Sequence, residues 1–359
     1  MTDERLVNTG GGCVGGVDTH GLTHHAAVVD GVGRHLADRQ FPATARGYRA
    51  LVAWMRCQAG ARGVTVVGVE GTGAYGAQLT RALTAAGITV VEVDRPDRKT
   101  RRLRGKSDPV DAYAAAAAVL SGRARGVPKE RDGVVEAIRV LRVARRSAIK
   151  ARTQVINQMR ALLVTAPAVL RERLTGLGRG VLVDKLARSR PGSELSDPVV
   201  ATRWALRRLA RHHQVLDIEV VELDAQLGVL VARAAPAVVE LNGVGTDTAG
   251  QLLVTAGGNP DRMRSEAAFA HLVGAAPIPA SSGRVHRHRL NRGGDRQANN
   301  ALYVITLSRM RHDPRTQTYV QRRTHEGLSK REIIRCLKRY IAREIYRALT
   351  NPPPPTAIT

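Results

Sequence analysis

The sequence predicts an α/β domain with a mixed sheet, followed by a mostly helical region. Strand-like apolar runs are confined to about the first hundred residues, and three of them come in succession before any helical pattern. From about residue 133 the apolar residues recur at helical spacing and basic residues become frequent. We therefore expect a sheet-containing N-terminal domain with helical domains after it.

The order of the elements distinguishes between possible α/β folds for this N-terminal domain. The patterns predict strands over 13–20, 25–30 and 34–43, a helix over 45–60, a strand over 63–70, a helix over 75–87, a strand over 88–94 and a helix opening near 108. Three successive strands followed by alternating helices and strands is the order of a ribonuclease-H-like domain. A doubly wound nucleotide-binding fold would alternate from its beginning.

Two long helices are expected next, over about 133–164 and 197–234, joined by a link that contains glycine and proline. Arg145 and Arg152 interrupt an approximate heptad stripe in the first helix. The expected apolar positions are Val134, Ile138, Leu141, Ala148, Val155, Met159 and Leu162, then Trp204, Leu209, Leu216, Leu223, Leu227 and Leu230. The two helices suggest an antiparallel hairpin. It could be an ordinary helical spacer, or it could serve in dimerisation or in RNA contact.

A third, mostly helical unit is expected from residue 236. Its last helix should begin at Ser329-Lys330-Arg331-Glu332, which has the spacing of a capping box. Four prolines at 352–355 should end the fold in an extended tail.

The charge of the chain indicates a polyanionic partner. The 359 residues contain 56 Lys and Arg against 31 Asp and Glu, a net charge of +25. Nucleic acid is the commonest polyanion, and the 3% aromatic content favours arginine–phosphate contacts over base stacking. An anionic membrane surface is the other possible partner, but the sequence has no long apolar stretch, signal peptide or lipidation motif.

The three cysteines bear on the cellular compartment. Cys13, Cys57 and Cys336 lie far apart and lack metal-ligand spacing. A reducing cytoplasm therefore fits the sequence, and a structural zinc site does not.

Four acidic residues stand where a metal site would need them. Asp18 ends the first expected strand and Glu70 ends the fourth, so the two should lie side by side in a ribonuclease-H-like sheet. Asp108 and Asp111 are three residues apart, on one face of the following helix. Four carboxylates at one sheet edge would hold two Mg²⁺ or Mn²⁺ ions for phosphoryl transfer, and the glycines after Glu70 would admit substrate.

Each acid also has a purely structural explanation. Asp108 before Pro109, with Asp111 three residues on, makes a good helix N-terminus, with Asp108 as the N-cap. Asp18 before Thr19 fits a turn at a strand end. The conjunction of all four at topologically related positions favours the metal site.

The C-terminal unit contains two motifs for phosphate contact. Gly243 and Gly245 precede a helix in a helix-hairpin-helix type of turn, whose backbone amides can bind a DNA phosphate; a plain interhelical turn explains them equally well. Further on, Ser281 and Ser282 stand in a small-residue loop before a basic stretch. The basic residues of that stretch are Arg284, His286, Arg287, His288, Arg289 and Arg292.

Two chemical roles are possible for the serine block, which comprises Ser281, Ser282 and the basic stretch that follows them. A serine hydroxyl is a poor nucleophile unless nearby groups stabilise its alkoxide, and guanidinium groups can also stabilise charge on a pentacovalent phosphate. Alternatively, the block is a loop with a basic strand that binds backbone phosphates. No Ser-His-Asp triad is evident.

Taken together, "GVDTH", "VEGTG", "KSDPVDA" and "GAAPIPASSG…HRLNRGG" resemble the insertion sequence 110 family of DEDD transposases over nearly the whole chain. The resemblance implies a RuvC-like DEDD domain (13–130), a helical coiled-coil region (131–235) and a C-terminal transposase domain with a catalytic serine (236–350). Asp18, Glu70, Asp108 and Asp111 match the four family carboxylates. Ser282 matches the catalytic serine, although Ser281 is adjacent.

The resemblance further implies a recombinase that excises and inserts its own element. Its serine would attack a DNA phosphodiester to form a transient 5′-phosphoserine link, with the metal site completing a composite centre. A structured noncoding bridge RNA would pair with donor and target DNA. Dimers or tetramers, joined through the helical region, would act in the bacterial cytoplasm at the nucleoid.

Two other functions compete with recombination. A RuvC-like metal nuclease would cut DNA junctions by hydrolysis and use the serine loop only to hold phosphate. A binding protein with structural acids would not depend on Mg²⁺. The complete acid set disfavours the binding protein, and the serine block, interpreted through the resemblance, favours the recombinase over the nuclease.

Overall fold

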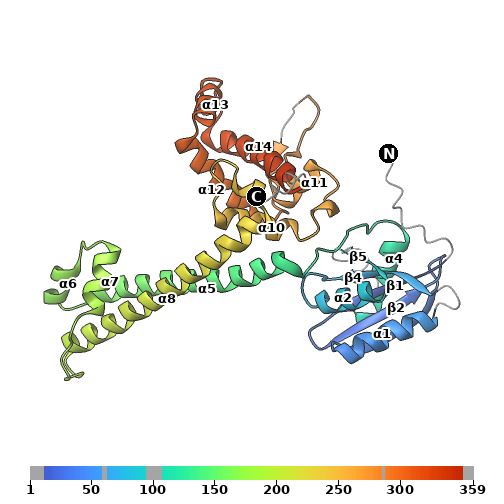
Figure 1. The fold of residues 1–359 in the computed structure, drawn as a ribbon, viewed down its shortest axis with the longest axis horizontal. Helices are drawn as coiled ribbons and strands as arrows, with labels where there is room; N and C mark the ends of the chain where they lie inside the picture. Colours follow the sequence, from blue (N-terminus) through green and yellow to red (C-terminus); the bar gives the residue numbers. More distant parts are fainter. Residues whose placement is uncertain (1–11, 59–62, 94–106, 285–287, 351–359) are drawn as a thin grey trace, which may run out of the picture. The chain divides into compact units, whose positions relative to one another are not determined.

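The computed structural model describes residues 12–58, 63–93, 107–284 and 288–350, and the chain divides into two compact units (Figure 1). The first unit is Met1–Arg131 together with Asn259–Arg264. The second unit is Asp132–Gly258 and Ser265–Thr359. The predicted tail at 352–355 lies outside the described residues.

The first unit contains a five-stranded mixed sheet in the order β3-β2-β1-β4-β5. Its strands are β1 (Cys13–Thr19), β2 (Thr23–Val29), β3 (His35–Pro42), β4 (Val64–Glu70) and β5 (Thr89–Val93). The first three strands pair antiparallel, β1 pairs parallel with β4, and β4 pairs parallel with β5. This confirms the predicted α/β fold with a ribonuclease-H-like mixed sheet.

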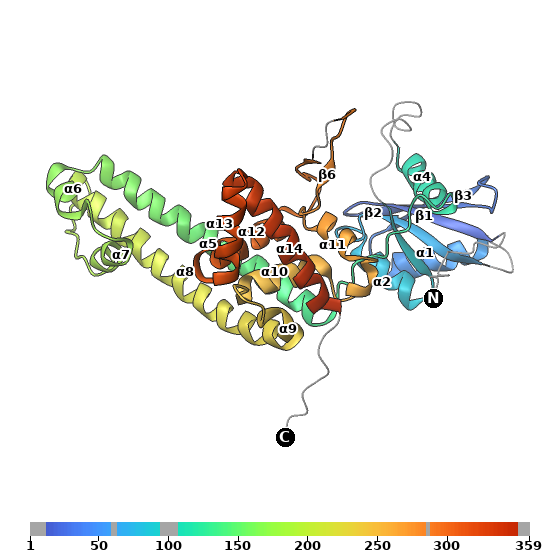
Figure 2. The same cartoon turned by 90° about the horizontal axis from the view of Figure 1, so that it is seen from above.

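Helices cover both faces of this sheet (Figure 2). The helices are α1 (Ala45–Gln58), α2 (Ala77–Ala85) and α4 (Asp108–Leu120). On one face, Leu51 of α1 and Leu79 of α2 pack with Val67 of β4 in a buried cluster. On the other face, Ala115 of α4 packs with Val14 of β1. Apolar residues on both sides of β1 and β4 therefore bury the centre of the sheet.

Two strand glycines let α4 approach the sheet closely. A Cβ at Gly16 of β1 would lie 2.1 Å from the carbonyl oxygen of Ala112. A Cβ at Gly68 of β4 would lie 2.8 Å from the carbonyl oxygen of Ala115. Real Cβ atoms do not approach backbone oxygens so closely, so these positions need glycine. This packing sets the place of the N-terminus of α4.

The second unit begins with the predicted helical hairpin, in which α5 (Gly133–Val164) runs beside α8 (Pro198–Ala234) (Figure 1). Arg145 of α5 pairs with Asp224 of α8, and Arg152 pairs with Asp217, so the two helices are antiparallel. The two arginines that interrupt the apolar stripe are therefore the residues that pair across the hairpin.

Parts of the prediction for this hairpin were wrong. Trp204 is 46% exposed rather than on the apolar side, and the guanidinium carbon of Arg208 lies 5.8 Å from its ring centre. Val134 and Leu162 are also exposed, because a strict heptad drifts relative to the 3.6-residue period of a straight helix. The expected link forms two further helices, α6 (Ala168–Leu174) and α7 (Arg179–Ala187), whose leucines join the hairpin core.

The rest of the second unit is mostly helical. Its elements are α9 (Pro236–Val239), α10 (Thr246–Ala256), α11 (Glu266–Leu272), β6 (Ile278–Pro279), β7 (His288–Arg289), α12 (Arg296–His312), α13 (Pro314–His325) and α14 (Lys330–Thr350). The predicted capping box of α14 is confirmed, because the Ser329 amide donates to Glu332 Oε2 (2.9 Å) and the Glu332 amide donates to Ser329 Oγ (3.4 Å). The domain boundary predicted at 235/236 falls inside this unit and stays a prediction.

Two further observations concern membrane-spanning helices and disulfides. No helix in the described part of the chain is long and apolar enough to cross a membrane. The three cysteines, all within the described ranges, form no disulfide.

Candidate active-site residues in the two units

The structure brings Asp18 and Glu70 to neighbouring strand ends. Val17 of β1 is the register partner of Val69 of β4, and each acid follows directly. The Thr19 hydroxyl donates to the Glu70 carbonyl oxygen (2.8 Å), which ties the two ends together. Asp18 is 7% exposed and Glu70 is partly exposed. The adjacency expected from the strand order therefore exists.

Helix α4 contributes Asp108 and Asp111 from its first turn. Asp111 is 3% exposed, whereas the side chain of Asp108 is 47% exposed. The alternative in which Asp108 is the N-cap was wrong by one residue, because Ser107 occupies that position and Asp108 is the first helical residue. Asp108 is therefore not needed as the cap, although its charge still favours a helix N-terminus.

Asp18 and Asp108 share a neighbour that the sequence interpretation missed. His20 Nε2 lies 3.0 Å from Asp18 Oδ2 and 3.3 Å from Asp108 Oδ1. Ligand atoms of the three residues all lie within 4.8 Å of one another. Carboxylate oxygens with an imidazole nitrogen form a donor set that suits a divalent cation, so these residues fit one. The signal available was the Asp-x-His spacing, because alternate residues of a strand share a face.

The glycine cluster after Glu70 forms a compact turn before α2. Gly71 has φ of +71°, a conformation that favours glycine, and its carbonyl oxygen accepts from the Gly76 amide (3.1 Å). The Thr72 hydroxyl donates to Glu92 Oε1 of β5 (2.6 Å). This turn holds the end of β4 beside β5.

The serine block forms a short hairpin in the second unit. Strands β6 and β7 pair antiparallel, with Ile278 opposite Arg289 and Pro279 opposite His288. Ser281 and Ser282 follow β6 and are exposed. The sequence predicted a small-residue loop at the two serines and, in one alternative, a basic strand after it. Strand β7 lies in that basic stretch, whereas its pairing with β6 was not predicted.

The basic residues near these serines fall into two groups. Arg284, Arg289 and Arg292 are exposed, as a phosphate-binding role requires. His286 and Arg287 lie outside the described residues.

The base of the serine hairpin is firmly held. A Cβ at Gly294 would lie 2.3 Å from the Gly274 backbone nitrogen. The segment that leads into β6 and the segment that follows β7 therefore come into close contact at these two glycines. Asn299 of α12 donates to the carbonyl oxygens of Val273 and Gly274, both at 2.9 Å. Lys338 Nζ of α14 donates to Asn299 Oδ1 (2.5 Å). The exposed turn is thus carried on a fixed base.

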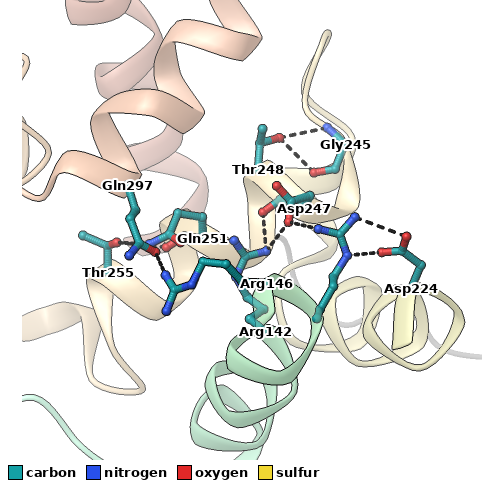
Figure 3. Close-up of polar contacts among 10 residues, drawn as sticks. Arg142, Arg146, Asp224, Gly245, Asp247, Thr248, Gln251, Thr255 and Gln297 are labelled. Carbon is teal, nitrogen blue, oxygen red and sulfur yellow. Dashed lines mark hydrogen bonds and ion pairs between the residues drawn. The ribbon is translucent and has the colours of Figure 1, made fainter. Parts of the chain in front are cut away.

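A polar network connects α5 with α10 and with the start of α12, and Figure 3 shows part of it. Arg142 NH1 donates to Asp247 Oδ1 (2.8 Å) and its NH2 donates to Gln251 Oε1 (3.1 Å). Gln251 Nε2 donates to Thr255 Oγ1 (3.1 Å), and this hydroxyl lies 2.8 Å from Asp295 Oδ2. Asp295 caps α12 by accepting from the Gln297 amide (2.8 Å). The network therefore ends at the residue that follows the serine block.

A cleft of about 700 Å³ lies between the serine hairpin and α14. The basic residues that line it are His288, Arg289, Arg335, Lys338, Arg339 and Arg343. Burial lowers the pKa of Lys338. Glu266 of α11 pairs with Arg339 and with Arg343 (3.0 Å), which leaves a net positive lining. Such a cleft suits a phosphate backbone.

The glycine turn before α10 is partly satisfied within the protein. Gly243 has φ of +73°, and Arg309 Nε donates to the carbonyl oxygen of Asn242 (2.7 Å). The Gly245 amide donates to Thr248 Oγ1 (3.1 Å) (Figure 3). Asp247 in the first turn of α10 is held by Arg142 and Arg145. The plain-turn explanation thus accounts for these contacts, and phosphate binding at this turn stays a prediction.

Comparisons with known proteins match both regions of interest. A family model described as a transposase, of the DEDD IS110 type, matches residues 15–166, which include all four acids. A second, described as the transposase IS116/IS110/IS902 family, matches residues 235–321, which include Ser282. The chain belongs to the IS110 family of transposases.

Two curated proteins are similar to this IS110-family transposase. The insertion element IS900 uncharacterized 42 kDa protein of Mycobacterium paratuberculosis is 30% identical over 42% of this chain and 37% of its own length. The insertion element IS110 uncharacterized 43.6 kDa protein of Streptomyces coelicolor is 34% identical over 29% of this chain and 26% of its own length. The matched stretches thus span roughly a third of the relatives' lengths.

Proposed function

We propose that this IS110-family transposase is a DNA recombinase that excises and inserts its element by strand exchange. Ser282 acts as the nucleophile, and Asp18, Glu70, Asp108 and Asp111 hold Mg²⁺ or Mn²⁺. The observation that carries the proposal is that the two matched regions contain, respectively, the four acids and the serine hairpin. The convergence of Asp18, His20 and Asp108 supports the metal site.

The serine step follows from the exposure and charge of the hairpin. The Ser282 hydroxyl loses its proton as Oγ bonds to a DNA phosphorus, and the bond to the 3′ oxygen breaks, which yields a 5′-phosphoserine link and a free 3′ hydroxyl. Attack by the 3′ hydroxyl of another strand releases the serine. Arg284 and Arg289 would stabilise the charge on the phosphate, since guanidinium groups donate two hydrogen bonds at once.

The acids of the first unit have a complementary role. Their negative charge attracts divalent cations, and the fixed strand ends hold Asp18 and Glu70 in place. A cation bound there supplies Lewis-acid stabilisation of phosphate charge. The buried carboxylate of Asp111 would face the protein side of the site. The more exposed carboxylate of Asp108 would face its solvent side.

The partners belong to the same proposal. The partners would be donor and target DNA together with a structured noncoding guide RNA, and the net charge of +25 is compatible with binding both. A dimer or tetramer would form through the hairpin of α5 and α8. The protein would act in the bacterial cytoplasm at the nucleoid.

The deciding experiment looks for a covalent protein–DNA species. Purified protein, Mg²⁺, RNA from the element's ends and labelled donor and target DNA are combined and resolved on a denaturing gel. We compare wild type with Ser282→Ala and with Ser281→Ala, since Ser281 is the neighbouring serine and is also exposed. An adduct that is lost in Ser282→Ala and kept in Ser281→Ala is expected.

Other outcomes assign other functions. Cleavage without an adduct in all three proteins would mean metal-dependent hydrolysis, and the junction-nuclease function would replace recombination. Binding without cleavage, unaffected by Mg²⁺, would point to a binding protein with structural acids. An adduct lost in Ser281→Ala alone would move the nucleophile by one residue.

A further inference from the structure

His20 lies between the carboxylates of Asp18 and Asp108, directly after the end of β1. It follows the last residue of β1, and its amide donates to the Thr23 carbonyl oxygen (3.1 Å) in the turn to β2. The same amide is 3.4 Å from Nδ1 of His24, which is fully buried and stacked on Tyr48 with ring centres 5.6 Å apart. The backbone of His20 is thus anchored independently of its side chain.

The distances around His20 Nε2 match those between ligands of one cation. Neighbouring ligands in an octahedron with bonds of about 2.1 Å lie about 3.0 Å apart. His20 Nε2 is 3.0 Å from Asp18 Oδ2 and 3.3 Å from Asp108 Oδ1. The His20 side chain is 43% exposed, which leaves it an open path to solvent ions.

We propose that His20 is a nitrogen ligand of the cation held by Asp18 and Asp108, and that it makes the site prefer Mn²⁺ to Mg²⁺. The inference rests on the metal site of the proposed function and adds a ligand to its four acids. Mg²⁺ takes oxygen ligands and keeps much of its water, whereas first-row transition cations bind imidazole nitrogen more strongly. A single nitrogen donor among carboxylates therefore shifts selectivity toward the transition cation.

The alternative role for His20 is a hydrogen bond to the two carboxylates without contact to metal. In that role the imidazole would orient Asp18 and Asp108, and the cation would be surrounded by oxygen alone. The two roles differ in whether nitrogen couples magnetically to a bound Mn²⁺ ion.

The test is pulsed electron paramagnetic resonance on the full-length protein with Mn²⁺. Electron spin echo modulation reports a directly bound imidazole nitrogen, and labelling with ¹⁵N-histidine changes its frequency without any mutation. We compare wild type, His20→Gln, Asp18→Asn and His25→Gln. His25 is a matched control because its Nε2 also contacts an aspartate, Asp38 Oδ2 at 2.7 Å, on the same sheet.

We expect nitrogen modulation in wild type and His25→Gln and none in His20→Gln. Mn²⁺ affinity should fall about tenfold in His20→Gln with little change for Mg²⁺, since only the nitrogen donor is lost. Saturable Mn²⁺ binding that Asp18→Asn removes, but without nitrogen modulation in wild type, would overturn the role of His20 and leave the metal site standing. Absence of such Mn²⁺ binding in wild type would overturn both the role of His20 and the metal site. The serine chemistry is tested separately, by the adduct assay.

Discussion

Gly16 of β1 lies directly beneath Ala112 of α4, so closely that an added Cβ would stand 2.1 Å from the Ala112 carbonyl oxygen. This contact sets the distance between the strand that carries Asp18 and the helix that carries Asp108. The proximity of Asp18, His20 and Asp108 therefore depends on a residue that is not one of the three.

We predict that Gly16→Ala destabilises the first unit by about 3 kcal/mol or more, because the clash is with backbone, which cannot rotate away. Gly15→Ala is the matched control, since its added Cβ would meet the side-chain ends of Met55 and Val67 at 3.0 Å. Urea unfolding followed by Trp54 fluorescence in a Trp204→Phe background measures both. Equal losses in the two variants would contradict the assigned role of the Gly16 contact.

A second prediction concerns Glu70. Glu70→Gln should lower adduct formation more than about 100-fold, because it removes negative charge from the proposed metal site while keeping the shape of the side chain. Nucleic-acid affinity should stay within about twofold, since the basic surface is intact. Gel shifts and the adduct assay on one preparation separate the two effects. Retained adduct formation in Glu70→Gln would count against the metal site.

A third prediction concerns Thr255, whose hydroxyl is buried between Gln251 and Asp295. Thr255→Val should cost about 1–2 kcal/mol of unfolding free energy and slow adduct formation, because Gln251 and Asp295 lose a partner. Thr306→Val is the control, since the Thr306 hydroxyl is also buried but donates to Leu302 of its own helix (2.7 Å). If both variants lose stability but neither changes the adduct rate, the network has no part in holding the serine hairpin.

A fourth prediction concerns pH and the helical hairpin. Burial lowers the pKa of His213 on α8 from its usual 6.5, with Arg152 and Arg179 adding to the shift and Asp217 opposing it. As pH falls below about 6.5, His213 becomes protonated in the unfolded chain but stays neutral in the folded hairpin. The unfolding free energy therefore falls by at most about 1.4 kcal/mol per pH unit.

The measurement uses a Trp54→Phe background, which leaves Trp204 of α8 as the reporter among the two tryptophans of the chain. Urea unfolding at pH 5.5, 6.5 and 7.5 should show a weaker pH dependence in His213→Gln than in the parent. His212→Gln, at the exposed neighbouring position, should keep the parental dependence. If the pH dependence of the unfolding free energy is unchanged in His213→Gln, another titratable group causes it.

Local patterns were sufficient to predict most elements of this chain. Apolar runs predicted the five strands, and the second long helix was expected from about residue 197. Asp197 is the N-cap of α8, and its side chain accepts from the Val199 amide (2.8 Å). Such signals act within a few residues, so they can be recognised in the sequence without knowledge of the tertiary structure. The strand order also predicted that Asp18 and Glu70 would be neighbours.

Other features could not be predicted because they depend on packing between distant segments. Trp204 has the spacing of an apolar-side residue, yet its exposure is set by the exact phase of α8 against α5. The two-residue strands β6 and β7 carry too few residues for a periodic signal, and their pairing depends on the crossing of Gly274 and Gly294.

The sequence by itself determined the family, the mixed-sheet fold, the helical hairpin and the residue types available for catalysis. The tertiary structure decided which of those residues meet. His20 joins Asp18 and Asp108 because the end of β1 and the start of α4 converge at glycine-lined contacts, 90 residues apart along the chain from Asp18 to Asp108. Convergence of that kind is a property of packed backbones, and no local pattern encodes it.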